Sequence, residues 1–109
     1  ARSLAAGHPV TIEPARTVAD GLMPVRPGDI TFAHARAWVD DMVTVDDDAI
    51  IDAARMLMAR SKLVVEFSGA ATVAALRSGA VDARGRRVAA VVSGGNMDPQ
   101  RALALLGQA

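Results

Sequence analysis

Residues 88–96 read VAAVVSGGN, an apolar run that ends in a turn of small and polar residues. Consecutive apolar residues without alternation are typical of a strand that is buried on both faces. In open α/β folds, ligands bind at the carboxyl ends of such strands. Asp98 and Pro99 follow and suit the first turn of a helix. The stretch predicts a strand over 86–92 and a helix after the turn. The turn either binds a ligand or only connects the strand to the helix.

Helical and extended patterns alternate along the rest of the chain. Helices are expected over 2–6, 32–39 (capped by Thr31), 46–60, 69–77 and from 98 onward. Residues 42–45 predict a short strand, whereas 63–65 fit either a strand or the end of the preceding helix. The alternation predicts an α/β fold with a mainly parallel sheet and flanking helices. Since the apolar strand needs neighbours on both edges, we expect another polypeptide segment to complete the sheet.

Composition excludes several classes of function. The 12 basic and 12 acidic residues give a net charge of zero, so neither nucleic acid nor a membrane surface is an expected partner. The absence of cysteine excludes disulfides and thiolate metal sites. No apolar run reaches the roughly 18 residues of a membrane span, and no signal-peptide pattern opens the chain. We therefore expect a soluble, cytoplasmic protein.

Four blocks with specific spacing occur in order along the chain. They are TVADG (17–21), VDDMVTV (39–45), KLVVEFSGAA (62–71) and VVSGGN (91–96). Together they resemble the C-terminal third of the pyridoxal-phosphate-dependent serine/threonine dehydratases, the fold type II family that includes serine racemase. The resemblance runs from about 3 to 106, with one departure, because Phe67 stands where the family usually has proline.

The resemblance implies a tryptophan-synthase-β-like fold that is incomplete without an upstream segment. Residues 1–30, which are rich in proline, would form a loop-rich segment leading into the cofactor pocket. Residues 31–109 would form the C-terminal α/β part of the pyridoxal-phosphate domain. The implied partners are the upstream part of the enzyme, on the same polypeptide or a separate chain, and further copies in a homo-oligomer.

The resemblance also assigns five residues to the cofactor pocket. Ser93 would face the pyridine nitrogen, where a neutral hydroxyl gives a weaker electron sink than a carboxylate, although Ser93 could also satisfy backbone groups in a turn. Gly94 would let the flat ring approach, and Gly21 would lie against it, unless Gly21 serves only a turn. Glu66 would lie near the pocket or pair at the start of a helix. Asp20 would order the pocket or cap its turn.

Two essential parts of such an enzyme are missing from the sequence. The chemistry requires a Schiff-base lysine and a phosphate-binding glycine loop. The single lysine, Lys62, occupies a structural position of the family pattern. Both parts would therefore lie upstream, together with most or all ligands of any divalent or monovalent cation. We expect no catalytic residue and no metal ligand in this chain, and an isolated chain without activity.

The resemblance implies an ammonia-lyase whose small amino-acid substrate is L-threonine, L-serine or both. The products would be a 2-oxo acid and ammonia. Serine racemase and hydroxyaspartate dehydratase, which share the fold, are alternatives, and an isolated chain could instead be a non-catalytic fragment or interaction module. The chain ends soon after the SGGN turn, so we expect an enzyme without the regulatory domain of biosynthetic forms, unless the chain is also cut at its C-terminus.

Overall fold

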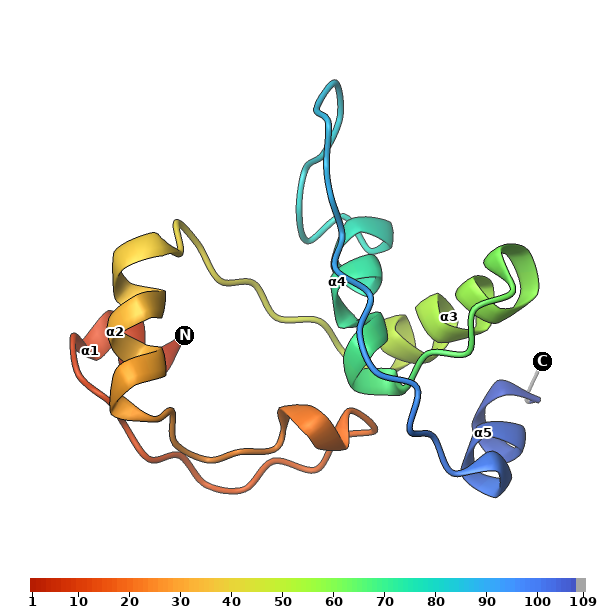
Figure 1. Ribbon diagram of the computed structural model, residues 1–109, viewed down its shortest axis with the longest axis horizontal. Coiled ribbons are helices and arrows are strands. Elements are labelled where there is room, and N and C mark those ends of the chain that lie inside the picture. Colours follow the sequence, from red (N-terminus) through yellow and green to blue (C-terminus); the bar gives the residue numbers. More distant parts are fainter. Residues whose placement is uncertain (108–109) are drawn as a thin grey trace.

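The computed structural model describes residues 1–107, so the last two residues of the region expected over 31–109 lie outside it. Its helical elements are α1 (Arg2–Ala6), the 3-10 turn η1 (Asp20–Leu22), α2 (Asp29–Trp38), α3 (Asp47–Met56), the π-helical turn η2 (Leu57–Ser61), α4 (Phe67–Arg77) and α5 (Pro99–Leu106). Figure 1 shows α1 and α2 side by side in one group and α3, α4 and α5 in a second, joined by long extended links. No helix within residues 1–107 is long and apolar enough to cross a bilayer.

Local capping chemistry sets the ends of several helices as the sequence predicts. The side chain of Asp46 accepts a hydrogen bond from the backbone N–H of Ala49 at 2.8 Å and begins α3, which continues through η2 to Ser61. Asp98 caps α5 in the same way, with Pro99 in the first turn. Gly7, at φ 74°, ends α1. These boundaries confirm the expected helices.

Helix α2 differs from the expectation at its start and on its apolar face. It begins at Asp29 with Gly28 as the N-cap, so Thr31 is not the cap, and the Thr31 hydroxyl donates back to the Gly28 carbonyl at 2.9 Å. Phe32 is buried, but Trp38 is 82% exposed. In the described chain α2 packs on the short helix α1, which covers only part of the apolar face.

The core lies between α3 and α4 and is built mainly from alanine. Because alanine side chains are small, the two helices approach each other closely, and Phe67 supplies the aromatic ring. The core cluster consists of Ala19, Ile50, Ala53, Ala54, Leu57, Val65, Phe67, Ala70 and Ala74. Ala19 belongs to the segment before η1, so the core also anchors the polypeptide around residue 20.

The expected strands are not formed within residues 1–107. Residues 42–45, 63–65 and 86–92 are extended or irregular, and Val91 is 70% exposed rather than buried. The extended segments make isolated contacts instead of a ladder: Thr72 donates to the Val91 carbonyl at 2.7 Å, and the Glu66 N–H donates to the Gly94 carbonyl at 3.3 Å. A strand requires a continuous neighbour, which these residues lack here. Within residues 1–107 the run 86–92 is therefore neither paired nor buried, and the strand and the parallel sheet stay predictions.

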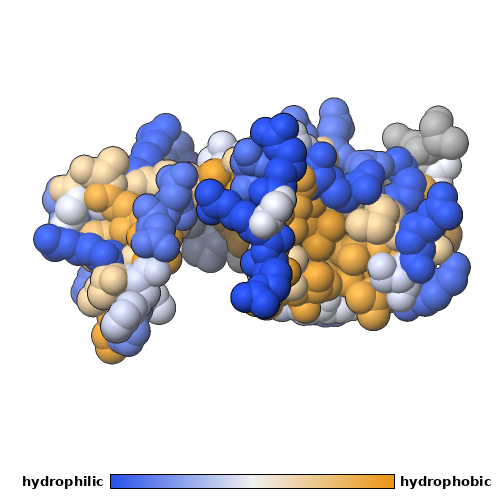
Figure 2. All heavy atoms as spheres, turned by 90° about the horizontal axis from the view of Figure 1, so that it is seen from above, coloured by the Kyte–Doolittle hydropathy of each residue, from blue (hydrophilic) through white to orange (hydrophobic). Residues whose placement is uncertain are grey.

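Apolar side chains remain exposed beside these extended segments. Figure 2 shows apolar surface gathered over the group of helices that holds α3 and α4. Exposed apolar residues of the extended segments include Leu63, Val64, Val88 and Val91. Exposed apolar surface of this kind is typical of a face that contacts further protein, a ligand or a membrane.

Candidate functional site

Three segments that are distant in the sequence meet at the N-terminal turn of α4. The backbone N–H of Gly21 donates to the Ser68 hydroxyl at 2.8 Å, which joins η1 to α4. On α4, a Cβ built on Gly69 would lie 1.6 Å from the Ser93 carbonyl oxygen. Only glycine permits this approach, because a backbone carbonyl cannot rotate away as a side chain can. The start of α4 is thus the point against which residues 21 and 93 are positioned.

The backbone conformation of Gly94 favours glycine, and the Glu66 side chain lies close against it. It has φ 73°, in the left-handed region that favours glycine. A Cβ at this position would lie 2.1 Å from the Oε1 atom of Glu66. The Glu66 N–H also donates to the Gly94 carbonyl, so the Glu66 backbone and side chain both lie against the turn that carries Ser93.

The segment before Gly21 is anchored from α3. Asp47 accepts hydrogen bonds from the Thr17 hydroxyl at 2.5 Å and from the Val18 N–H at 3.0 Å. Asp47 lies in the first turn of α3, where an acidic side chain interacts favourably with the helix N-terminus. In the structure it holds residues 17–18 beside α3, which fixes the path of the chain into η1.

Asp20 and Arg101 connect the same turn to α5. The Asp20 carboxylate accepts from the Gly21 N–H at 2.9 Å and lies 3.8 Å from Nη1 of Arg101. Arg101 also donates to the Val18 carbonyl at 3.1 Å, and its guanidinium lies 5.9 Å from the ring centroid of Phe67. The distance to the ring suits a cation–π contact. Residues 18–21 are therefore held from α3, α4 and α5.

A small polar cavity of about 50 Å³ lies between these elements. It combines three carboxylates, one amide and one guanidinium. Its lining residues are Asp20, Glu66, Phe67, Asn96, Met97, Asp98 and Arg101. The volume is far below the roughly 300 Å³ at which pockets for small molecules begin. This cavity is therefore too small to enclose a small molecule, and within the described residues no group of His, Cys, Asp or Glu could hold a metal ion.

All five residues proposed from the sequence lie around this junction. Asp20, Gly21 and Glu66 are joined to it by the contacts above, and Gly94 lies against Glu66. Ser93 is exposed, and its hydroxyl makes no hydrogen bond to any other part of the chain that the structure describes. That hydroxyl is therefore available to a ligand. Contact of the five residues with a cofactor stays a prediction.

The structure gives Gly21 a second reason to be glycine. A Cβ at this position would lie 2.8 Å from the Ser68 hydroxyl oxygen. A side chain at position 21 would therefore require the Ser68 hydroxyl to move, and the Gly21–Ser68 hydrogen bond would be disturbed. Ser68, Gly69 and Arg101 were not identified as site residues from the sequence. Gly69 could have been identified from the sequence, because a glycine inside a helical pattern usually has a packing reason.

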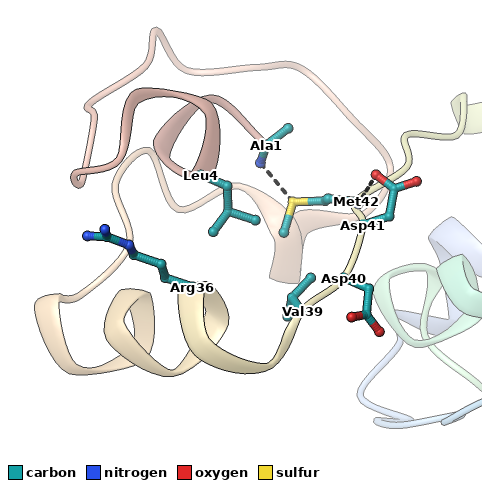
Figure 3. A pocket seen from close by; sticks show the side chains of 7 residues that line it. All are labelled: Ala1, Leu4, Arg36, Val39, Asp40, Asp41 and Met42. Atoms are coloured by element: carbon teal, nitrogen blue, oxygen red, sulfur yellow. Dashed lines mark hydrogen bonds between the residues drawn. The ribbon is translucent and has the colours of Figure 1, made fainter.

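A larger and more open hollow, of about 360 Å³, lies in the other group of helices. Figure 3 shows the side chains of Leu4, Val39 and Met42 pointing toward one another, whereas the carboxylates of Asp40 and Asp41 point away. Its lining residues are Ala1, Leu4, Arg36, Val39, Asp40, Asp41 and Met42. Figure 1 places α1 and α2 apart from α4 and α5. This hollow is therefore separate from the five candidate residues.

Residues 1–94 match the family model described as "Pyridoxal-phosphate dependent enzyme". The chain is 42% identical over 96 residues to the L-threonine ammonia-lyase of Thermotoga maritima. The aligned region covers 88% of this chain and 24% of the relative. It is 39% identical over 105 residues to the L-threo-3-hydroxyaspartate ammonia-lyase of a Pseudomonas species, covering 96% of this chain and 33% of the relative.

The fold of the chain is also similar to that of a solved structure from the same group of enzymes. The structure of maize serine racemase superposes with a TM-score of 0.80 at 35% identity, covering 99% of this chain and 35% of the racemase chain. The chain thus spans only about a quarter to a third of the length of the relatives it matches.

Proposed function

Because this chain belongs to the pyridoxal-phosphate-dependent enzyme family, we propose that it forms one wall of the cofactor pocket of an ammonia-lyase for L-threonine or L-serine. The observation that carries the proposal is the convergence of Ser93, Gly94, Gly21, Glu66 and Asp20 around the start of α4. Relatives that are named as ammonia-lyases support the reaction class.

The donor set at this wall fits the cofactor. When bound, pyridoxal phosphate supplies an electron sink that allows an amino acid to lose its Cα proton. Ser93 presents an exposed hydroxyl that can either donate to or accept from the pyridine nitrogen. Its backbone is fixed on one side by Gly69 and followed by the left-handed turn at Gly94. The chain therefore offers a neutral, positioned partner for a ring nitrogen.

The other residues of the wall keep this hydroxyl in place. Glu66 lies against Gly94, so its carboxylate supports the turn that follows Ser93. Asp20 and the Gly21 N–H order the facing turn through contacts with Arg101 and Ser68. We assign these groups to orientation of the ring and place the proton-transferring lysine outside residues 1–109.

The remaining machinery belongs, in this proposal, to an upstream segment that covers the exposed apolar surface. That segment would contribute the Schiff-base lysine, the phosphate-binding loop and any cation ligands. Exposed Val64 and Val91 support this arrangement, because they lie on extended segments without strand neighbours in the described chain. The fraction of the relatives that the chain spans supports it as well.

Purified natural polypeptide containing these residues is expected to convert L-threonine to its 2-oxo acid and ammonia. Loss of the Cα proton and the β-hydroxyl, followed by hydrolysis, accounts for both products. The rate of 2-oxo acid release should be measured in parallel with L-threonine, L-serine and L-threo-3-hydroxyaspartate. Preference for the third substrate would support the hydroxyaspartate alternative, and D-serine formation without any 2-oxo acid would contradict the ammonia-lyase proposal.

Ser93→Ala is expected to weaken cofactor binding while leaving the fold intact. Removal of one hydrogen bond to the ring should cost about 0.5–1.5 kcal/mol of binding free energy. The fold should tolerate the change, because the exposed hydroxyl bonds to no other described residue. Titration of apoprotein with pyridoxal phosphate, followed by cofactor absorbance, measures the effect.

Ser78→Ala provides the matched control for this substitution. The Ser78 hydroxyl is exposed at the opposite end of α4, where it donates to the Ala75 carbonyl at 3.4 Å. It should leave cofactor affinity unchanged. Equal affinities of Ser93→Ala and wild type would exclude Ser93 from the cofactor site.

A further inference from the structure

Arg101 is the only basic side chain among the residues that line the small polar cavity. It lies in the first turns of α5, and 40% of its side chain is exposed. Its guanidinium contacts the Val18 carbonyl, the Asp20 carboxylate and the face of Phe67. These three contacts orient the planar group, whereas one exposed ion pair would be screened by solvent.

Two of these contacts are with the turn that presents Gly21. Asp20 directly precedes Gly21, Val18 lies three positions before it, and the Gly21 N–H donates to the hydroxyl of Ser68 on α4. Arg101 therefore holds the turn from the side of α5, while Ser68 holds it from the side of α4. Without the guanidinium, the Val18 carbonyl would lose this donor and the Asp20 carboxylate its nearby cation.

The segment 93–101 connects the Ser93 turn to the turn of residues 18–21 within the proposed wall. It starts with the exposed hydroxyl of Ser93 and ends, one helical turn into α5, with the guanidinium that reaches residues 18–20. A displacement of α5 would therefore change the position of the Gly21 turn relative to Ser93.

We propose that Arg101 is a positioning residue, which fixes the position of the turn of residues 18–21 relative to Ser93 for cofactor binding. This inference rests on the proposed function of the wall. Arg101 acts through Val18 and Asp20 and is assigned no contact with substrate or cofactor. The position of α5 thereby becomes part of the geometry of the cofactor site.

Arg101→Gln in the full natural polypeptide tests the inference with two readouts. In cofactor-free protein, amide hydrogen exchange over residues 18–22 is expected to accelerate, because the turn loses one of its restraints. In cofactor-loaded protein, the visible circular dichroism of the bound ring should change, and affinity should fall by roughly two- to tenfold, as expected for loss of one hydrogen bond. Arg101→Lys keeps the charge beside Asp20 and should restore part of the affinity.

Arg77→Gln is the matched control, because it also removes one arginine from an ion pair. Arg77 binds Asp52 at 2.8 Å at the far end of α4 from Gly21. It should change neither the exchange rate at 18–22 nor the cofactor spectrum. An equal effect of Arg77→Gln and Arg101→Gln would overturn the inference, because it would show a general loss of stability.

The two readouts separate failure of the inference from failure of the proposed function. Unchanged exchange over residues 18–22 in Arg101→Gln would overturn the inference even if the wild type binds cofactor well. An unchanged spectrum and affinity in loaded protein would also overturn it. Wild-type protein that binds no pyridoxal phosphate would instead refute the proposed function, and the role of Arg101 in cofactor binding with it.

Discussion

Replacing Gly69 by alanine is expected to destabilise the fold by about 1–3 kcal/mol, the range for overpacking a tightly packed interior. The new Cβ would lie 1.6 Å from the Ser93 carbonyl oxygen and 3.0 Å from Cγ1 of Val65. The carbonyl is part of the backbone, so relief of the clash requires movement of α4 away from residue 93. Denaturant unfolding of the natural polypeptide measures the loss of stability, and titration with pyridoxal phosphate measures the displacement of Ser93.

The expected sign of the change in unfolding free energy makes the Gly69→Ala experiment decisive. At an unhindered helical position, glycine to alanine stabilises by up to about 1 kcal/mol. Gly28→Ala is the control: its Cβ would meet only the rotatable Thr31 hydroxyl at 3.3 Å, and its φ of −67° suits alanine. It should change stability little. A stability gain in Gly69→Ala would contradict the close approach between α4 and residue 93.

Helix ends were predictable from the sequence because their causes are local. The side chains of Asp46 and Asp98 cap helices by accepting from the backbone N–H of a residue three or two positions later in the chain. Gly7 adopts the left-handed conformation that ends α1. Strands have no such local cause. The apolar run around Val91 favours a strand, but a strand also needs a paired neighbour, and in residues 1–107 only scattered hydrogen bonds reach this run.

The candidate site could be predicted only where its residues form recognisable blocks. Ser93, Gly94 and Gly21 lie in short glycine-containing turns that the structure brings together at the start of α4, whereas their contact with a cofactor stays a prediction. The role of Arg101 could not be predicted, since its contact with Val18 spans 83 positions of sequence. No local pattern distinguishes it from Arg77, which forms an exposed ion pair elsewhere.

Lys62 has a structural role that accounts for its presence without catalysis. It has φ 58° and ends η2, and its Nζ donates to the Ala59 carbonyl at 2.7 Å. A lysine at this place interacts favourably with the carbonyls at a helix C-terminus. It is exposed, whereas a Schiff-base lysine is activated by desolvation or by a neighbouring cation. A catalytic lysine outside this chain stays a prediction.

The isolated chain of residues 1–109 is accordingly expected neither to hold pyridoxal phosphate at a specific site nor to deaminate threonine. Borohydride reduction with stoichiometric pyridoxal phosphate, followed by peptide mapping, should give at most weak labelling of Lys62. Excess threonine should lower such labelling no more than an equal excess of an amino acid that is not a substrate, because any free amine competes with a surface lysine for the aldehyde of pyridoxal phosphate. Lys62→Arg keeps the positive charge at the end of η2 and should match the wild type in fold and in lack of activity. Saturating label on Lys62 that threonine removes would place the catalytic lysine in this chain and contradict an upstream location.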